Sequence, residues 1–114
     1  MRDVVVVGSL NVDVSVRAER LPAAGETLRA SDLSIGAGGK GLNQAIGASR
    51  LGARVHMVGR LGHDHFAEVA ENALRDAGVD ASYVQREAAA HTGTALITVD
   101  ARTGENSIAV AGGA

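Results

Sequence analysis

The sequence predicts an α/β fold in which a parallel sheet with flanking helices stands beside a small antiparallel sheet. A β-branched run, Val4 to Val7, stops at Gly8, which is typical of a strand buried on both faces of a parallel sheet. Two segments further along the chain have the period of amphipathic helices. Segments with the two-residue alternation of half-exposed strands lie before and after this stretch.

The first residues are expected to form the central strand of the parallel sheet, and the next segments to form antiparallel strands. Val12, Val14 and Val16 alternate with polar residues, as in a strand with one wet face. The following "LPAAGE" (21–26) carries the only proline and predicts a turn. Residues 27–35 are then predicted as a second antiparallel strand.

Two helices are predicted in the middle of the chain. The first covers residues 40–51, where apolar side chains share a face and Gly52 follows as a stop. The second has Asp64 as its N-cap and ends at Gly78. Its apolar residues recur at helical spacing and are Phe66, Val69, Ala70, Ala73, Leu74 and Ala77.

Short strands at residues 55–58 and 82–85 complete the parallel unit, because strands and helices alternate in the order that a right-handed parallel sheet requires. The segment "EAAAHTG" (87–93) resembles a linker, and a hairpin follows it. The predicted antiparallel strands are residues 12–17, 27–35, 94–99 and 106–111, and the predicted α/β core comprises residues 3–9 and 40–86.

Composition restricts the possible functions. The 114 residues fit one small domain, whose core must use small side chains because the apolar 46% is mainly Ala and Val. A net charge of -2 without basic runs argues against nucleic acid binding. Cysteine is absent, which excludes disulfides and suits the cytoplasm. No apolar run approaches the length of a membrane span, so no membrane association is expected.

The stretch "GAGGKGLNQ" (36–44) contains the glycine spacing of dinucleotide-binding loops. Such a loop follows the first strand directly, whereas this one comes much later. A phosphate loop needs Ser or Thr after Gly-Lys, and Gly41 stands there. What remains is a glycine run at a helix N-terminus, whose amides can bind an anion or a polyol. Taken alone, the glycines fit equally well a purely structural tight turn.

Asn11 and Asp13 lie two residues apart just past the first strand, so both side chains can face the edge where α/β proteins bind ligands. A carboxylate there can accept two hydroxyl protons. For either residue alone, a turn-forming Asn and an exposed Asp explain the sequence as well. Together with the glycine run, however, the pair favours a site for a polyhydroxylated ligand.

Taken together, these segments resemble the ribokinase branch of the ribokinase-like, or PfkB-type, carbohydrate kinases. The matching stretches are "VVVVGSLNVD", "LPAAGET", "GAGGKGLNQAIGASRLGA", "VGRLGHD", "TGTALITVD" and "GEN". The resemblance covers nearly the whole chain and implies a central α/β sandwich with a small β-lid that closes over the sugar. The expected fold is therefore the ribokinase-like parallel sheet with flanking helices and an antiparallel β-lid, of which this chain would be the N-terminal part.

The resemblance also implies which residues bind the substrate. The implied hydrogen-bonding groups for the sugar are Asn11, Asp13, Asn43 and the backbone of Gly38 and Gly39. Lys40 would lie close to the path of the transferred phosphate. The implied lid residues that pack on the apolar side of the sugar ring are Ala95, Ile97 and Val110.

The chain departs from the family where Gly62-His63-Asp64 replaces Gly-Asp-Asp and where Gly112-Gly113-Ala114 replaces Gly-Ala-Asn. The family's catalytic base is the Asp of a G-A-G-D-like motif, which is absent here. Three parallel strands and two helices also cannot cover both faces of a sheet. We therefore expect an N-terminal segment of a longer kinase, with no catalytic residue. His63 and His65 lack a third ligand, so no metal site is expected.

Two classes of function remain open. The first is a kinase that transfers the γ-phosphate of ATP to the 5-hydroxyl of D-ribose, or to a sibling sugar or nucleoside. The second is a non-catalytic sugar-binding or oligomerising module. The resemblance implies ATP and Mg²⁺ as cofactors, activation by K⁺ in many members, a homodimer formed through the β-lid, and a cytoplasmic location.

Overall fold

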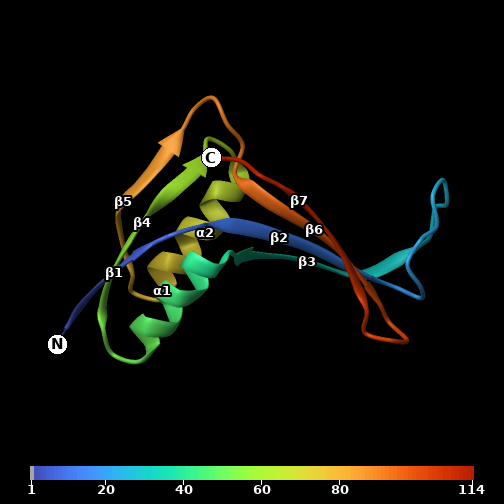
Figure 1. The fold of residues 1–114 in the computed structure, drawn as a ribbon, viewed down its shortest axis with the longest axis horizontal. Helices are drawn as coiled ribbons and strands as arrows, with labels where there is room; N and C mark the ends of the chain where they lie inside the picture. The colour runs from blue at the N-terminus through green and yellow to red at the C-terminus, as the bar shows by residue number, and fades with distance from the viewer. Residues whose placement is uncertain (1) are drawn as a thin grey trace.

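The structure, a computed structural model, describes residues 2–114 and contains two sheets and two helices (Figure 1). The parallel sheet has the order β1-β4-β5, and the second sheet has the order β3-β2-β6-β7. The elements, in chain order, are β1 (Asp3–Val7), β2 (Asn11–Ala18), β3 (Ala30–Gly38), α1 (Lys40–Arg50), β4 (Arg54–Gly62), α2 (His65–Asp76), β5 (Asp80–Glu87), β6 (Gly93–Asp100) and β7 (Asn106–Ala111). The predicted α/β class, with a parallel sheet, two helices and a second sheet, is confirmed.

The expectation that the first strand is central and buried on both faces is wrong. β1 lies at the edge of the parallel sheet and β4 at its centre. Val4 and Val6 pack on the core, whereas Val5 is 61% exposed and Val7 is 77% exposed. The cause is that α1 and α2 contact each other and pack on the same face of the sheet, which leaves the other face open.

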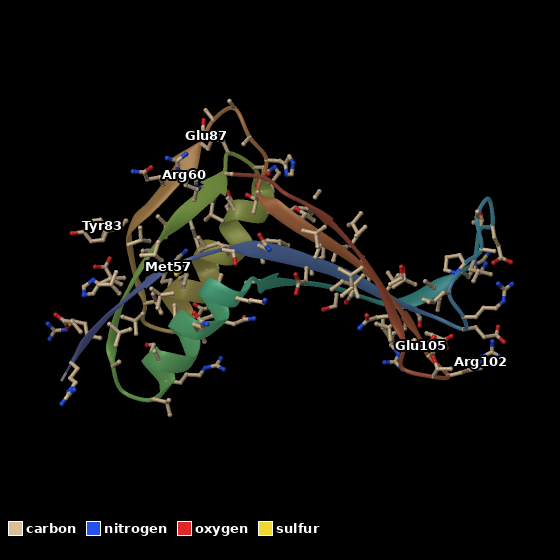
Figure 2. The ribbon with its side chains drawn as sticks, in the orientation of Figure 1. Met57, Arg60, Tyr83, Glu87, Arg102 and Glu105 are labelled. Atoms are coloured by element: carbon tan, nitrogen blue, oxygen red, sulfur yellow. The ribbon has the colours of Figure 1, made fainter. Side chains whose placement is uncertain are left out.

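The two faces of the parallel sheet differ accordingly in their side chains. Met57 on β4 is fully buried, while Tyr83 on β5 is 62% exposed and points away from the molecule in Figure 2. The buried core, built largely from small and aliphatic residues, comprises Leu10, Leu42, Ala45, Val55, Met57, Leu61, Ala67, Ala70, Leu74 and Val79. The sheet of this chain is thus covered on one side only, as the number of its helices predicts.

Both predicted helices are present. α2 begins after Asp64, whose Oδ1 accepts a hydrogen bond of 3.0 Å from the amide of Ala67, so the predicted N-cap is confirmed. α1 ends just before Gly52, which adopts a φ of 98° that favours glycine. No helix among residues 2–114 is both long enough and apolar enough to cross a membrane.

The second sheet is mixed and not purely antiparallel, which corrects the expectation for the lid strands. β2 pairs antiparallel with β3, but it pairs in parallel with β6 along its whole length, from Asn11↔Gly93 to Ala18↔Asp100. Parallel pairing is possible because residues 19–92, which include both helices, separate β2 from β6, so no tight hairpin turn joins the two strands. β7 then returns antiparallel to β6, with Ala95 opposite Val110.

Candidate functional site

The glycine run spans the end of a strand and the start of a helix. Gly36 and Gly38 belong to β3, which begins and ends three residues later than predicted, and Gly39 is the N-cap of α1. Gly39 has a φ of 96°, and a Cβ on this residue would lie 2.8 Å from the carbonyl oxygen of Ser9. Glycine is therefore required here both for the backbone conformation and for the close approach to the neighbouring chain.

Asp13 lies directly over the glycine run. A Cβ built on Gly38 would come within 2.6 Å of Oδ2 and 2.7 Å of Oδ1 of Asp13, so any larger residue here would displace this carboxylate. Asp13 is half-buried, and both of its oxygens lie beside the chain that leads into α1. A carboxylate in this setting can accept two hydroxyl protons next to the N-terminus of a helix.

Strand register places apolar side chains in the same row as Asp13. Asp13 pairs with Ala95 of β6, and Ala95 pairs with Val110 of β7. Directly paired residues face the same side of a sheet, so these three side chains share one face. Ile97 lies two residues further along β6 on that face, opposite Ile108. The face thus combines one carboxylate with a short apolar strip.

Asn11 occupies the same edge of the sheet as the start of β6. Its partner in the register is Gly93, and a Cβ on Gly93 would lie 2.4 Å from Oδ1 of Asn11. The Asn11 side chain therefore lies over the Gly93 backbone, just as the Asp13 side chain lies over Gly38. The structure brings Asn11, Asp13, Gly38, Ala95 and Val110 into one region.

The N-terminus of α1 supplies only some of the amides that the sequence predicts. The amide of Leu42 already donates to the carbonyl of Ser9 at 3.0 Å, which fastens the first turn to the end of β1. The amides of Lys40 and Gly41 have no hydrogen-bond partner among residues 2–114. The side chains of Lys40 and Asn43 are exposed, and Asn43 lies further along the helix. The helix start can therefore offer two amides, an ammonium and an amide side chain.

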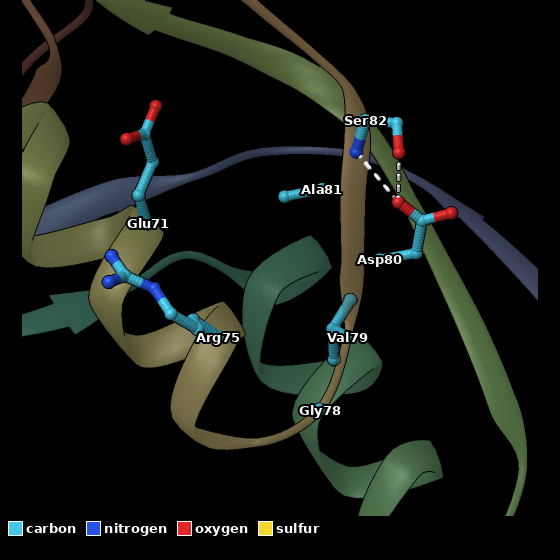
Figure 3. A pocket seen from close by; sticks show the side chains of 7 residues that line it. All are labelled: Glu71, Arg75, Gly78, Val79, Asp80, Ala81 and Ser82. Carbon is cyan, nitrogen blue, oxygen red and sulfur yellow. Dashed lines mark hydrogen bonds between the residues drawn. The ribbon is translucent and has the colours of Figure 1, made fainter.

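A cleft of about 650 Å³ lies elsewhere, between the C-terminal half of α2 and the start of β5 (Figure 3). Glu71 and Arg75 border it on α2, and Asp80 and Ser82 on β5. None of the predicted substrate residues lines this cleft. No group of three His, Cys, Asp or Glu side chains suited to a metal ion occurs within residues 2–114.

Thr92 is a buried polar residue that no sequence pattern singled out. It falls in the predicted linker, yet it is 0% exposed. Its amide and hydroxyl donate to Asp64 at 2.8 and 2.7 Å. Burial raises the pKa of Asp64, but the hydrogen bonds from Thr92 and Ala67 outweigh it, so the net pKa is lowered and the carboxylate is ionised at neutral pH.

The predicted N-cap at Asp64 was the only signal that could have pointed to this contact. A capping carboxylate has a second oxygen, which needs a donor when it is half-buried. The sequence does not say which of the following residues supplies that donor.

Comparison with known proteins gives a consistent picture. The whole chain, residues 1–114, matches the family described as "pfkB family carbohydrate kinase". It is 41% identical over 114 residues to a ribokinase of Bacillus subtilis (strain 168), covering 100% of this chain and 38% of that protein. It is 38% identical over 112 residues to a deoxyribokinase of Salmonella typhi, covering 98% of this chain and 36% of that protein.

A solved structure matches the chain with a similar sequence identity and a similar coverage. The Arabidopsis thaliana ribokinase complexed with ribose and ATP superimposes with a TM-score of 0.89 at 42% identity, covering 99% of this chain and 36% of the other. The chain thus spans little more than a third of the length of each of these proteins.

Proposed function

The chain belongs to the pfkB family of carbohydrate kinases, and from this premise we propose that it carries the sugar-binding part of an ATP-dependent D-ribose kinase. The reaction is transfer of the γ-phosphate of ATP to the 5-hydroxyl of ribose. Relatives of the chain include ribokinases and a deoxyribokinase, and one ribokinase was solved with ribose and ATP. These similarities support a pentose as the substrate and ATP as the phosphate donor.

The observation that carries the proposal is the position of Asp13. Its carboxylate lies against Gly38, at the entrance to a glycine-led helix and in register with the apolar residues Ala95 and Val110. A pentose has hydroxyl groups on its edges and a less polar ring face, so it fits a carboxylate beside an apolar strip. In this arrangement Asp13 and Asn11 hold ribose hydroxyls, while Ala95, Ile97 and Val110 pack on the ring.

The helix start has a separate role in the proposal. The backbone of Gly38 and Gly39 approaches the sugar oxygens together with the amides of Lys40 and Gly41. Asn43 binds a further hydroxyl. The Lys40 ammonium, which is exposed, stabilises negative charge on the transferred phosphate. Mg²⁺ neutralises the ATP phosphates in such reactions. Activation by K⁺ is also part of the proposal. We assign no residue of this chain to either ion, to the ATP or to the catalytic base.

Calorimetric titration with D-ribose tests the proposal. Asp13→Asn keeps the shape of the side chain but removes the charge, so we expect an affinity about 10- to 100-fold lower, equivalent to losing one charged hydrogen bond. Asp32→Asn is the matched control, because it removes the same charge from an exposed β3 position whose φ of 54° suits asparagine. Equal affinities for the two variants would remove Asp13 from the site.

The same titration with 2-deoxy-D-ribose tests whether ribose or deoxyribose is the preferred sugar, because 2-deoxy-D-ribose lacks only the 2-hydroxyl. If a group of the site binds the 2-hydroxyl, the deoxy sugar leaves that group without a partner, and we expect it to bind more weakly than ribose. Tighter binding of 2-deoxyribose would instead assign the chain to a deoxyribose kinase.

A homodimer formed through the second sheet is part of the same proposal. On the face opposite Asp13, Val14 pairs with both Ile35 and Leu96, and these two side chains are 48% and 55% exposed. An exposed apolar strip of this kind favours pairing with a second copy. Sedimentation analysis should show a dimer that Leu96→Lys converts to a monomer. A monomeric wild-type chain would exclude this interface.

A cytoplasmic location also belongs to the proposal.

A further inference from the structure

We propose that Asp64 and Thr92 are a positioning pair that fixes the beginning of β6 and thereby orients Asn11, an inference that rests on the proposed sugar site. Neither residue touches that site directly. They act through Gly93, which follows Thr92 in the chain and lies under the Asn11 side chain. The pair thus connects the helix layer to the substrate face of the second sheet.

The contact between the two residues uses both carboxylate oxygens of Asp64 and both the amide and the hydroxyl of Thr92. Oδ2 of Asp64 accepts from the Thr92 amide at 2.8 Å, and Oδ1 accepts from the Thr92 hydroxyl at 2.7 Å. The hydroxyl oxygen of Thr92 in turn accepts from the amide of Gly62 at 3.0 Å. The last residue of β4, the N-terminus of α2 and the start of β6 are therefore joined through one buried threonine.

This arrangement exceeds what capping of α2 requires. A helix cap needs one acceptor, and the bond from the Ala67 amide to Oδ1 of Asp64 provides it. The second oxygen is used for Thr92 alone. Removing the Thr92 hydroxyl would leave the buried amide of Gly62 without its acceptor while the cap stays intact.

Close backbone contacts surround the pair and transmit its position. A Cβ on Gly62 would lie 2.3 Å from the amide nitrogen of Thr92, so the segment before β6 passes directly over the end of β4. A Cβ on Gly93 would lie 2.4 Å from Oδ1 of Asn11. Any displacement of Thr92 therefore shifts Gly93 against the Asn11 side chain, and it also moves Ala95, the register partner of Asp13.

Three substitutions and one control test the pair by D-ribose titration. Thr92→Val keeps the shape and removes the hydroxyl, and we expect an affinity about tenfold lower. Thr92→Ser restores the hydroxyl and should restore the affinity. Asp64→Asn keeps an oxygen that can cap α2 but loses the charge, and it should also weaken ribose binding. This variant tests the pair independently if Thr92→Val fails to fold.

The control is Ser49→Ala, which removes a hydroxyl bond of 2.6 Å from Ser49 to the carbonyl of Ala77, at the opposite end of the helices. It should lower the thermal midpoint as Thr92→Val does, but leave the ribose affinity unchanged. Equal affinities of Thr92→Val and Ser49→Ala would overturn the proposal, as would failure of Thr92→Ser to rescue binding.

A second measurement separates this proposal from the proposed function. If the wild-type chain binds no ribose, the proposed function fails, but nuclear magnetic resonance still decides the role of Thr92. We expect Thr92→Val to shift the side-chain amide signals of Asn11 and the backbone amide of Gly93, and Ser49→Ala to leave both in place. Unchanged Asn11 signals in Thr92→Val would show that the pair does not orient this side chain.

Discussion

Gly41 is the residue at which the packing of α1 can be tested most sharply. It lies in the first turn of the helix, and a Cβ on it would stand 2.7 Å from the carbonyl carbon of Gly8 and 2.7 Å from the amide nitrogen of Ser9. Both neighbours are backbone atoms, so no side chain can rotate away. Gly41→Ala must therefore push the start of α1 away from the end of β1.

Two opposing effects determine the size of the change. Replacing glycine by alanine inside a helix stabilises it by at most about 1 kcal/mol. Overpacking against backbone costs about 3 kcal/mol, so the net loss is about 2 kcal/mol. For a chain of this size, that loss lowers the thermal midpoint by about 8 °C.

Gly47→Ala is the matched control in the same helix. Gly47 is exposed, and a Cβ on it would meet nothing within 4 Å. This variant should gain up to about 1 kcal/mol, and its midpoint should rise. Urea denaturation and thermal unfolding measure both variants. A Gly41→Ala variant as stable as Gly47→Ala would refute the close contact between helix and strand.

Two further predictions concern stability. Hydrogen bonds from the Ser82 hydroxyl and amide, and then from His56, lower the pKa of Asp80 from 3.8 to about 2. In urea melts at a series of pH values, the stability that wild type gains over Asp80→Asn should therefore be complete above about pH 4 and disappear as the pH falls toward 2. A difference that does not change with pH would contradict this. Val55→Ala on β4 should lower the free energy of unfolding by about 2 kcal/mol because Val55 is 1% exposed, whereas Val5→Ala on the open face should lower it by less than about 0.5 kcal/mol. Similar losses for the two variants in urea melts would mean that the open face is covered in solution.

Local patterns in the sequence were sufficient for most of the secondary structure. α2 follows from apolar residues at helical spacing after a capping aspartate, and both signals are properties of neighbouring residues. The alternation of Val12, Val14 and Val16 likewise indicated a strand with two different faces. Such short-range features do not depend on the rest of the fold.

The burial of β1 could not be predicted in the same way. A continuous valine run is typical of a strand covered on both faces, but its actual burial depends on where the helices pack. Here α1 and α2 share one side, so Val5 and Val7 remain exposed. The position of a helix relative to a sheet is a tertiary property that the valine run does not contain.

For the candidate site, too, features that lie close together in the sequence could be predicted, whereas contacts between distant segments could not. Asn11, Asp13 and the glycine run could be singled out because they lie close together in the sequence and follow a strand. The pairing of Asn11 with Gly93, and the burial of Thr92 against Asp64, join segments far apart in the chain. No single-sequence period marks such contacts, and the segment that contains Thr92 looked like a linker.

The parallel pairing of β2 with β6 has a consequence for how the chain folds during translation. When β2 and β3 leave the ribosome they can form a hairpin at once, but one edge of β2 stays unpaired until β6 has been synthesised. Until then the nascent polypeptide exposes an open edge of alternating valines, a form prone to mispairing with other chains. A chaperone would therefore be most useful in the interval between the synthesis of β2 and the synthesis of β6.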